Sequence, residues 1–222
     1  MVKAVFIDYM GTTVDEHSSE MAEIVRRICK NSSLHDPRQV QRFILDNRRR
    51  YEADSCMDAY LTQDEIVDRL ISDMADQIGL TDEPSALRGL IRSHWVNASV
   101  FPDARTFFDR CPVPIYIITN IGLLYMEQAL QNNGLKTAGV VSADNARAYK
   151  PHREIFDEAL RASGCTPGEA VHIGDSYDTD VVGARGVGIR PVLLLRGRAR
   201  QHDDVDVADG LDQALKLVFP KG

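Results

Sequence analysis

Residues 5–15 read Val-Phe-Ile-Asp-Tyr-Met-Gly-Thr-Thr-Val-Asp. An apolar run ends at the carboxylate of Asp8, and a glycine, Gly11, follows three residues later. Buried strands of a parallel sheet are apolar on both faces, and open α/β sheets bind ligands beside the carboxyl ends of their strands. The stretch therefore predicts a buried first strand that delivers Asp8 to a ligand-binding edge.

Short apolar runs recur later in the chain, with helical patterns between them. One helix is expected over 122–133, ended by Asn133-Gly134, and the next is expected to have Pro151 in its first turn and to end at Gly164. Alternating strands and helices predict right-handed crossovers and an α/β fold with a parallel sheet. The further strands are expected at 114–118, 138–142, 170–174 and 190–195.

The region from Glu20 to about Trp95 shows apolar residues at helical spacing and no convincing strand. Thr62 and Glu65 form a capping-box pattern that opens one of about four expected helices. We therefore expect two domains. Residues 1–15 and 97–222 form an α/β catalytic core, and residues 16–96 form an all-helical cap inserted after the first strand.

The composition narrows the function classes. With a net charge of −7, the chain lacks the excess positive charge with which proteins bind nucleic acid or an anionic membrane surface. The basic cluster 48–50 is interpreted as a solvated helix face. No apolar run approaches the length of a membrane span, and the four cysteines form no CxxC pair, so we expect a cytoplasmic protein with reduced thiols. Monomer and homodimer both remain open.

Polar residues cluster where four predicted segments reach the carboxyl edge of the sheet. They are Asp8 with Gly11 and Thr12, then Thr119-Asn120, then Lys150, then Asp175 and Asp180. Carboxylates gathered in one cleft repel one another, and a hard divalent cation such as Mg²⁺ removes that cost.

We expect each of these groups to have a role in the chemistry. Asp8 can act as a carboxylate nucleophile, while the Lys150 ammonium balances charge. Thr119 and Asn120 offer a hydroxyl and an amide to a transferred group. Substrate contacts are expected from Gly11, Thr12, Thr119, Asn120 and Lys150. These roles suit phosphoryl transfer to Asp8 followed by hydrolysis.

In this order, the four segments resemble the four motifs of the haloacid dehalogenase-like (HAD) hydrolase superfamily. Asp8 matches its nucleophile, Thr119 the hydroxyl of the second motif, Lys150 the lysine of the third, and Asp175 with Asp180 the acidic pair of the fourth. The resemblance implies a Rossmann-like doubly wound sheet with a helical cap. It also implies a Mg²⁺-dependent phosphohydrolase acting on a small phosphorylated metabolite.

The resemblance further implies the metal ligands. These are Asp8, the backbone carbonyl of Met10, and Asp175, with Asp180 either a ligand or a residue that orients Asp175. The departure is Met10 itself, because phosphatases of the superfamily usually carry an Asp there that protonates the leaving group. Met10 retains the backbone carbonyl that would bind the metal, but its side chain cannot donate a proton.

Two branches of the superfamily lack that Asp. Haloacid dehalogenases have a Tyr at that position, use no metal and lack the acidic pair, whereas this chain has Tyr9 one position early and keeps both acids. Phosphonoacetaldehyde hydrolase shares the run 11–15 but uses a cap lysine, and the only cap lysine here is Lys30. A catalytically weak binding or regulatory protein is the third alternative.

Three other residues are interpreted conservatively. His172 lies within an apolar strand and is expected to be packed and satisfied in its hydrogen bonds. Asp178 is expected to face solvent. Trp95 is expected to pack between cap and core.

Overall fold

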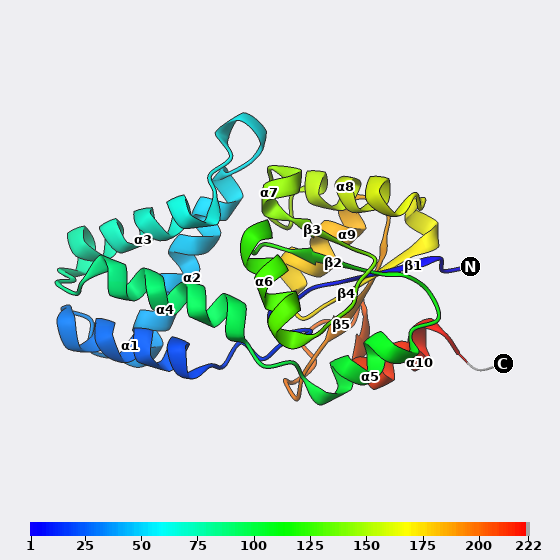
Figure 1. The fold of residues 1–222 in the computed structure, drawn as a ribbon, viewed down its shortest axis with the longest axis horizontal. Coiled ribbons are helices and arrows are strands. Elements are labelled where there is room, and N and C mark those ends of the chain that lie inside the picture. Colours follow the sequence, from blue (N-terminus) through cyan, green and yellow to red (C-terminus); the bar gives the residue numbers. More distant parts are fainter. Residues whose placement is uncertain (221–222) are drawn as a thin grey trace.

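The computed structural model describes residues 1–220. Its core is a six-stranded parallel sheet in the order β3-β2-β1-β4-β5-β6 (Figure 1). This is the order of a doubly wound Rossmann-type sheet, so the predicted fold class is confirmed. The strands are β1 (Ala4–Ile7), β2 (Ile115–Thr119), β3 (Gly139–Ser142), β4 (Ala170–Gly174), β5 (Arg190–Leu194) and β6 (Asp206–Ala208).

Helices cover both faces of this sheet and form a separate block beside one end of it (Figure 1). The α-helices are α1 (Ser19–Asn31), α2 (Pro37–Asp54), α3 (Gln63–Ile78), α4 (Pro84–Asn97), α5 (Pro102–Arg110), α6 (Leu123–Asn133), α7 (Ala143–Ala146), α8 (Arg153–Ser163), α9 (Val182–Gly186) and α10 (Leu211–Val218). Two short 3₁₀ segments, η1 (Met57–Ala59) and η2 (Pro167–Glu169), and a π-helical turn, η3 (Tyr177–Val181), complete the set.

The first strand is apolar throughout because both of its faces are covered. Val5 and Ile7 belong to the cluster that includes side chains of α5, α6 and α10, whereas Ala4 and Phe6 belong to the cluster with α8 and α9. Alternate side chains of a strand point to opposite faces, so a continuous apolar run is what a doubly covered strand requires. β1 lies between β2 and β4, which makes its end the middle of the sheet edge.

Helices α1–α4 all lie between β1 and α5 in the chain. The expected capping box opens α3: Thr62 Oγ1 accepts from the Glu65 amide, and the Glu65 carboxylate accepts from the Thr62 amide. Figure 1 shows this helical block beside the end of the sheet at which β1 finishes. The division into a cap over 16–96 and a core over the remaining residues stays a prediction.

Two local expectations need correction. Pro151 does not lie in the first turn of a helix. The chain makes a tight turn there, closed by a 2.9 Å bond from the His152 amide to the Tyr149 carbonyl, and α8 begins only at Arg153. No strand was expected after 190–195, but the loop that follows β5 leads into β6, a three-residue edge strand too short to produce a periodic pattern.

The two helices that the sequence predicted to end at a glycine do so. Gly134 and Gly164 adopt left-handed φ values of 61° and 68°, after α6 and α8 respectively. Within residues 1–220, none of the helices combines the length and the apolar character needed to cross a lipid bilayer.

A tight approach of α9 to α8 generates a test of the packing. A Cβ on Gly183 would lie 2.3 Å from the buried Phe156 ring and 3.1 Å from the Pro151 Cα. We expect Gly183→Ala to lower the free energy of unfolding by about 1–3 kcal/mol, because the ring has no space to retreat. Urea denaturation measures the change.

The matched control lies on the same helix. A Cβ on Gly186 would meet no atom within 4 Å, so Gly186→Ala should be neutral or slightly stabilising. Equal stability of the two variants would contradict the packing described for α9.

Candidate active site

The four predicted segments meet at one edge of the sheet. Asp8 follows β1, and its amide donates to the Ile173 carbonyl of β4 at 2.9 Å. Thr119 ends β2 beside β1, while Asp175 directly follows β4. Lys150, from the loop between α7 and α8, reaches the same place. The structure therefore brings together side chains that are up to 172 residues apart in sequence, from Asp8 to Asp180.

The centre of the site is a buried ammonium between two carboxylates. Lys150 Nζ lies 2.5 Å from Asp8 Oδ1 and 2.7 Å from Asp180 Oδ1. The three side chains are 4%, 9% and 2% exposed, so solvent screens these charges little. Burial alone would lower the pKa of Lys150, but the charges of Asp180 and Asp8 outweigh it and raise that pKa.

Three carboxylates share this space. Single oxygen atoms of Asp8, Asp175 and Asp180 all lie within 4.8 Å of one another. Burial, together with the charges of Asp180 and Asp175, raises the pKa of Asp8 to about 7. Burial and the charges of Asp180 and Glu16 raise the pKa of Asp175 to about 6. Each shift expresses first the cost of burying a carboxylate and then the repulsion from the charges beside it.

Asp180 behaves differently because its oxygens are fully engaged. Oδ1 accepts from Lys150 and, at 2.9 Å, from Nε2 of His172, while Oδ2 accepts from the Ser176 amide at 3.1 Å. Burial opposes ionisation, but the Lys150 charge and the His172 hydrogen bond hold the pKa of Asp180 below its usual value. It is the carboxylate that fixes Lys150 in place.

Two glycines leave space for the carboxylates of Asp175 and Asp180. Gly11 has a φ of 77°, and a Cβ there would lie 2.6 Å from Asp175 Oδ2. A Cβ on Gly174 would lie 2.2 Å from Asp180 Cγ. Thr12, next to Gly11, donates its hydroxyl to Asp175 Oδ1 at 3.2 Å. The first and fourth segments are thus in direct contact.

The donor set fits the divalent cation that the sequence predicted. Asp8 and Asp175 each supply a carboxylate, and oxygen donors are what Mg²⁺ prefers. Within residues 1–220, no loop or side-chain donor forms a hydrogen bond to the Met10 carbonyl, which leaves that oxygen free to serve as a ligand. The Met10 side chain packs against the main hydrophobic cluster.

Thr119 and Asn120, the residues of the second motif, form hydrogen bonds with other groups of the protein. Thr119 is buried, and its Oγ1 accepts from the Ile121 amide at 3.1 Å, so its own proton remains available. Asn120 Oδ1 accepts from the Lys150 amide at 2.7 Å, and its Nδ2 donates to Glu52 Oε2 at 3.2 Å. Asn120 therefore positions Lys150, and its expected contact with substrate stays a prediction.

Glu52 is a site neighbour that no sequence pattern marks. It lies near the end of α2, is 5% exposed, and contacts Asn120. Burial raises the pKa of this carboxyl group, although Arg48 and Asn120 partly offset the effect. Only the approach of α2 to the loop after β2 brings it here. Its approach gives the helical block a titratable group at the site.

Two further contacts also depend on tertiary structure. Arg198, from the loop after β5, donates to Asp175 Oδ2 at 3.0 Å and to the Asp175 carbonyl at 2.9 Å. His172 is packed as expected, with its ring edge-on to Phe156, but it also holds Asp180 and has an unpartnered Nδ1. The expectation of a fully satisfied histidine is therefore wrong.

The remaining conservative interpretations agree with the structure. The Asp178 side chain is 71% exposed and lies 3.6 Å from Arg49. Trp95 is buried and packs against Tyr125 of α6, with ring centroids 5.1 Å apart. The four cysteines are free and partly buried.

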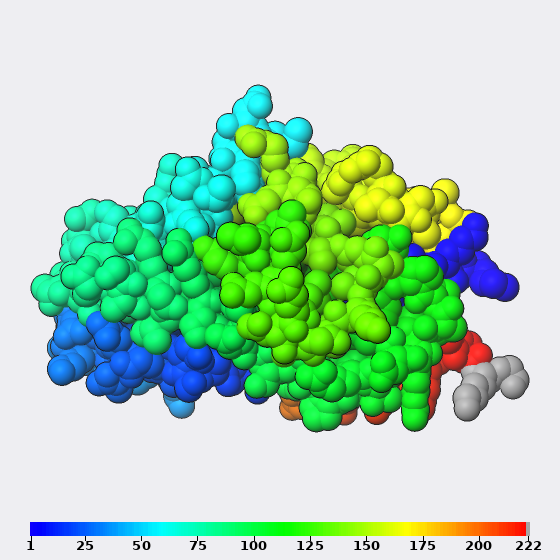
Figure 2. All heavy atoms as spheres, viewed as in Figure 1, coloured from blue at the N-terminus to red at the C-terminus, as the bar shows by residue number. Residues whose placement is uncertain are grey.

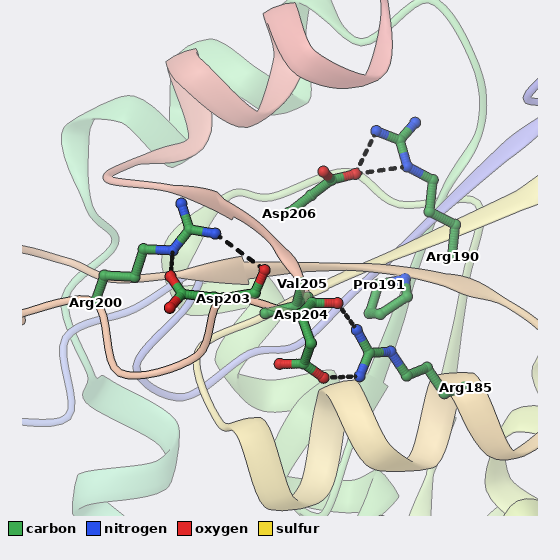
Figure 3. A pocket seen from close by; sticks show the side chains of 8 residues that line it. All are labelled: Arg185, Arg190, Pro191, Arg200, Asp203, Asp204, Val205 and Asp206. Carbon is green, nitrogen blue, oxygen red and sulfur yellow. Dashed lines mark hydrogen bonds and ion pairs between the residues drawn. The ribbon is translucent and has the colours of Figure 1, made fainter.

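A surface pocket of about 320 Å³ lies away from these motifs, beside β5 and β6 (Figure 3). Each of its arginines faces an aspartate: Arg185 with Asp204, Arg190 with Asp206, and Arg200 with Asp203. Paired in this way, these arginines have no unmatched charge to hold an anion. The pocket contains none of the motif residues.

Comparisons with known proteins agree with the resemblance to the HAD-like hydrolases. A family model described as HAD-hydrolase-like matches residues 148–215. Glyceraldehyde 3-phosphate phosphatase of Methanothermobacter thermautotrophicus is 33% identical over 87 residues, which cover 36% of this chain and 38% of that protein. Haloacid dehalogenase-like hydrolase domain-containing protein 3 of Danio rerio is 30% identical over 138 residues, covering 57% of this chain and 56% of that one. The matched regions thus span well under two thirds of these relatives.

Solved structures show the fold over nearly the whole chain. L-2-haloacid dehalogenase from Xanthobacter autotrophicus superposes with a TM-score of 0.79 at 20% identity, covering 98% of both chains. A HAD phosphatase from Thermococcus onnurineus gives 0.71 at 23% identity, again covering 98% of both. At this identity the likeness concerns the fold alone.

The crowded carboxylates predict a pH-dependent cost in stability. The raised pKa of Asp8 means that the folded state binds its proton more tightly than the unfolded chain does. The protonated Asp8 side chain therefore stabilises the folded state below a pH of about 4, and this stabilisation is lost as the pH rises to about 7. We expect Asp8→Asn to stabilise the metal-free protein at pH 8 by about 1–3 kcal/mol more than at pH 5.

Urea denaturation in EDTA at the two pH values measures this difference. Asp178→Asn, which changes an exposed aspartate of the same region, is the matched control and should show no such pH-dependent gain. Destabilisation of the Asp8→Asn protein at pH 8 would contradict the electrostatic account, because it would mean that the ion pair with Lys150 outweighs burial.

Proposed function

The chain belongs to the haloacid dehalogenase-like hydrolase superfamily, and on that premise we propose that it is a Mg²⁺-dependent phosphohydrolase of small phosphorylated metabolites, working through an aspartyl-phosphate at Asp8. The observation that carries the proposal is the cluster of Asp8, Asp175 and Asp180 within 4.8 Å around Lys150. Lys150 and Arg198 together bring two positive charges to three carboxylates. A divalent cation beside the nucleophile removes the remaining negative charge, and it also attracts a phosphate.

Asp8, the Met10 carbonyl and Asp175 are the proposed ligands of Mg²⁺. When bound, the cation neutralises charge on the nucleophile and on the phosphoryl oxygens. Asp180, whose oxygens already accept from Lys150, His172 and the Ser176 amide, is assigned to positioning Lys150.

The protein's residues divide the reaction between them. An Asp8 oxygen attacks phosphorus, the bond from phosphorus to the leaving-group oxygen breaks, and the leaving group departs as an oxyanion that takes a proton from water. Lys150 and the Thr119 hydroxyl hold the phosphoryl oxygens through the transfer. Water then attacks the aspartyl-phosphate, releasing inorganic phosphate and restoring the Asp8 carboxylate.

The proposal is preferred to dehalogenation because of Tyr9. That side chain is fully buried, and its hydroxyl accepts from Asn133 Nδ2 at 3.0 Å, at the end of α6. A tyrosine held in the core in this way is a poor candidate for a substrate contact. The retained acids Asp175 and Asp180 support the same preference.

A C–P hydrolase of the phosphonoacetaldehyde type is also less favoured. Its chemistry requires an amine from the cap, and between residues 16 and 96 the only lysine is Lys30. Lys30 lies exposed in the last turn of α1. A non-catalytic binding protein is the remaining alternative, against which the complete set of Asp8, Lys150 and Asp175 argues. The cytoplasmic location and the choice between monomer and homodimer stay predictions from the sequence.

The direct test is a panel of phosphorylated metabolites assayed with and without Mg²⁺. We expect phosphate release that depends on Mg²⁺, and a loss of about 10³-fold or more in Asp8→Asn, because a removed nucleophile leaves only binding and charge stabilisation. Beryllofluoride with Mg²⁺ should bind the unmodified protein and fail to bind Asp8→Asn.

Each alternative has its own outcome in these assays. Halide release from a 2-haloacid that survives EDTA would replace the proposal with a dehalogenase. Phosphate release from phosphonoacetaldehyde alone would replace it with a C–P hydrolase. A protein that neither turns over any substrate nor binds beryllofluoride would be the binding protein.

Met10 predicts a dependence on the leaving group. With no acid at this position, alkyl phosphates should turn over much more slowly than p-nitrophenyl phosphate, whose leaving group needs little protonation. We expect Met10→Asp to raise turnover of alkyl phosphates by about 10-fold or more, with a smaller effect on p-nitrophenyl phosphate.

Met10→Leu is the matched control, since it keeps an apolar side chain of similar size. It should leave the ratio of the two turnovers unchanged. The same ratio in Met10→Asp as in the unmodified protein would show that another group already supplies the proton.

A further inference from the structure

A second cluster of potential metal ligands lies outside the site described above. The thiol of Cys56, the imidazole of His152 and the carboxylate of Glu154 each have a donor atom within 4.8 Å of the others. All three side chains are partly buried. Cys56 follows α2 in the helical block, whereas His152 and Glu154 lie at the start of α8 on the sheet. The cluster therefore joins two separate parts of the fold.

Main-chain contacts hold the two segments together. Cys56 forms an antiparallel bridge with Ala148, and the Met57 amide donates to the Arg147 carbonyl at 2.7 Å. The Arg147 guanidinium donates back to the Met57 carbonyl at 3.0 Å. Figure 2 shows the cyan atoms of the loop after α2 lying against the yellow-green atoms around α7. The position of Cys56 relative to α8 is thus fixed by the backbone.

The histidine is oriented as a ligand would be. His152 Nε2 lies 2.9 Å from the Ala53 carbonyl oxygen, and because a carbonyl only accepts, Nε2 carries the hydrogen. In the neutral ring Nδ1 then holds a free lone pair. Metal-bound histidines in proteins usually donate their second nitrogen to a carbonyl or carboxylate in this way. This contact is independent of the clustering and leaves Nδ1 as the ring nitrogen available to a metal.

We propose that Cys56, His152 and Glu154 form a Zn²⁺ site that ties the loop after α2 to the segment following Lys150. Thiolate, imidazole and carboxylate are the donors Zn²⁺ takes, and three of them leave a fourth position for water. Tetrahedral bonds of about 2.0–2.3 Å place donor atoms roughly 3.3–3.8 Å apart, so small side-chain rotations complete the site. The thiol releases one proton to solvent as its sulfur binds.

The donor chemistry separates this site from the one at Asp8. Asp8, Asp175 and Asp180 offer only oxygen, which suits Mg²⁺, whereas a thiolate selects a softer ion. In the metal-free protein, burial and the Glu154 carboxylate raise the pKa of the Cys56 thiol. A cation between the two groups reverses that effect. The site does not depend on the proposed activity, because its test is metal binding.

The experiment uses the full chain, stripped of metal and supplied with excess Mg²⁺ to occupy the oxygen site. Co²⁺ is then titrated as a spectroscopic probe for Zn²⁺. We expect one Co²⁺ per chain, with a thiolate-to-cobalt charge-transfer band and tetrahedral d–d bands that Zn²⁺ abolishes. Hydrogen exchange of amides in residues 53–61 should slow when Zn²⁺ binds, because the loop is tied to α8.

Cys56→Ser should remove the charge-transfer band and weaken Zn²⁺ binding by about 100-fold or more. Cys165→Ser, a change at another partly buried thiol, is the matched control and should leave both unchanged. Glu154→Gln should weaken binding while keeping the charge-transfer band, which provides a second measurement if Cys56→Ser fails to fold.

Two outcomes would overturn the proposal. The first is the absence of a charge-transfer band in the unmodified protein. The second is equal Zn²⁺ affinity in the unmodified and Cys56→Ser proteins, which would identify the binding as nonspecific. Asp175→Asn should keep the Zn²⁺ site intact, so a failure of the Mg²⁺ chemistry is distinguishable from a failure of this one.

Discussion

The buried ammonium of Lys150 between Asp8 and Asp180 is the interaction around which the site is built. Without it, three carboxylates would share a cleft with little solvent to screen them. The surroundings are arranged to hold this cation. Asn120 fixes its main chain, and Asp180 is fixed in turn by His172 and the Ser176 amide. Gly174 has no side chain because Asp180 occupies that space.

The charge balance around Lys150 remains negative, which is unfavourable for folding and useful for function. A carboxylate whose pKa is raised to about 7 is poorly stabilised in the metal-free protein, and a cation or an incoming substrate with its metal can relieve that cost. The helical block contacts two segments that border Lys150. Glu52 contacts Asn120, and Cys56 pairs with Ala148, two residues before Lys150. Motion of the helical block relative to the sheet would therefore shift the position of the Lys150 ammonium.

Much of this arrangement could be predicted from local pattern. The apolar run before Asp8 predicted a strand covered on both faces, and Val5 and Phe6 do belong to opposite clusters. Thr62 with Glu65 predicted a capping box that forms. Patterns failed where an element was too short to be periodic, as in β6, or where a turn displaced a helix start, as at Pro151. Glu52 and Arg198 carry no motif, and only folding brings them to Asn120 and Asp175.

The sequence by itself determined the alternation of five strands with helices and the residues at the ends of those strands, because hydrophobic periodicity and helix-ending residues are local properties. It also determined the absence of an acid at position 10. The tertiary structure alone decided which groups share a low-dielectric space: that Asp180 engages Lys150 and His172, that Tyr9 faces Asn133, and that Cys56 lies beside Glu154. Those are contacts between residues distant in sequence. Their geometry follows from the packing of helices against a twisted sheet, which no single segment encodes.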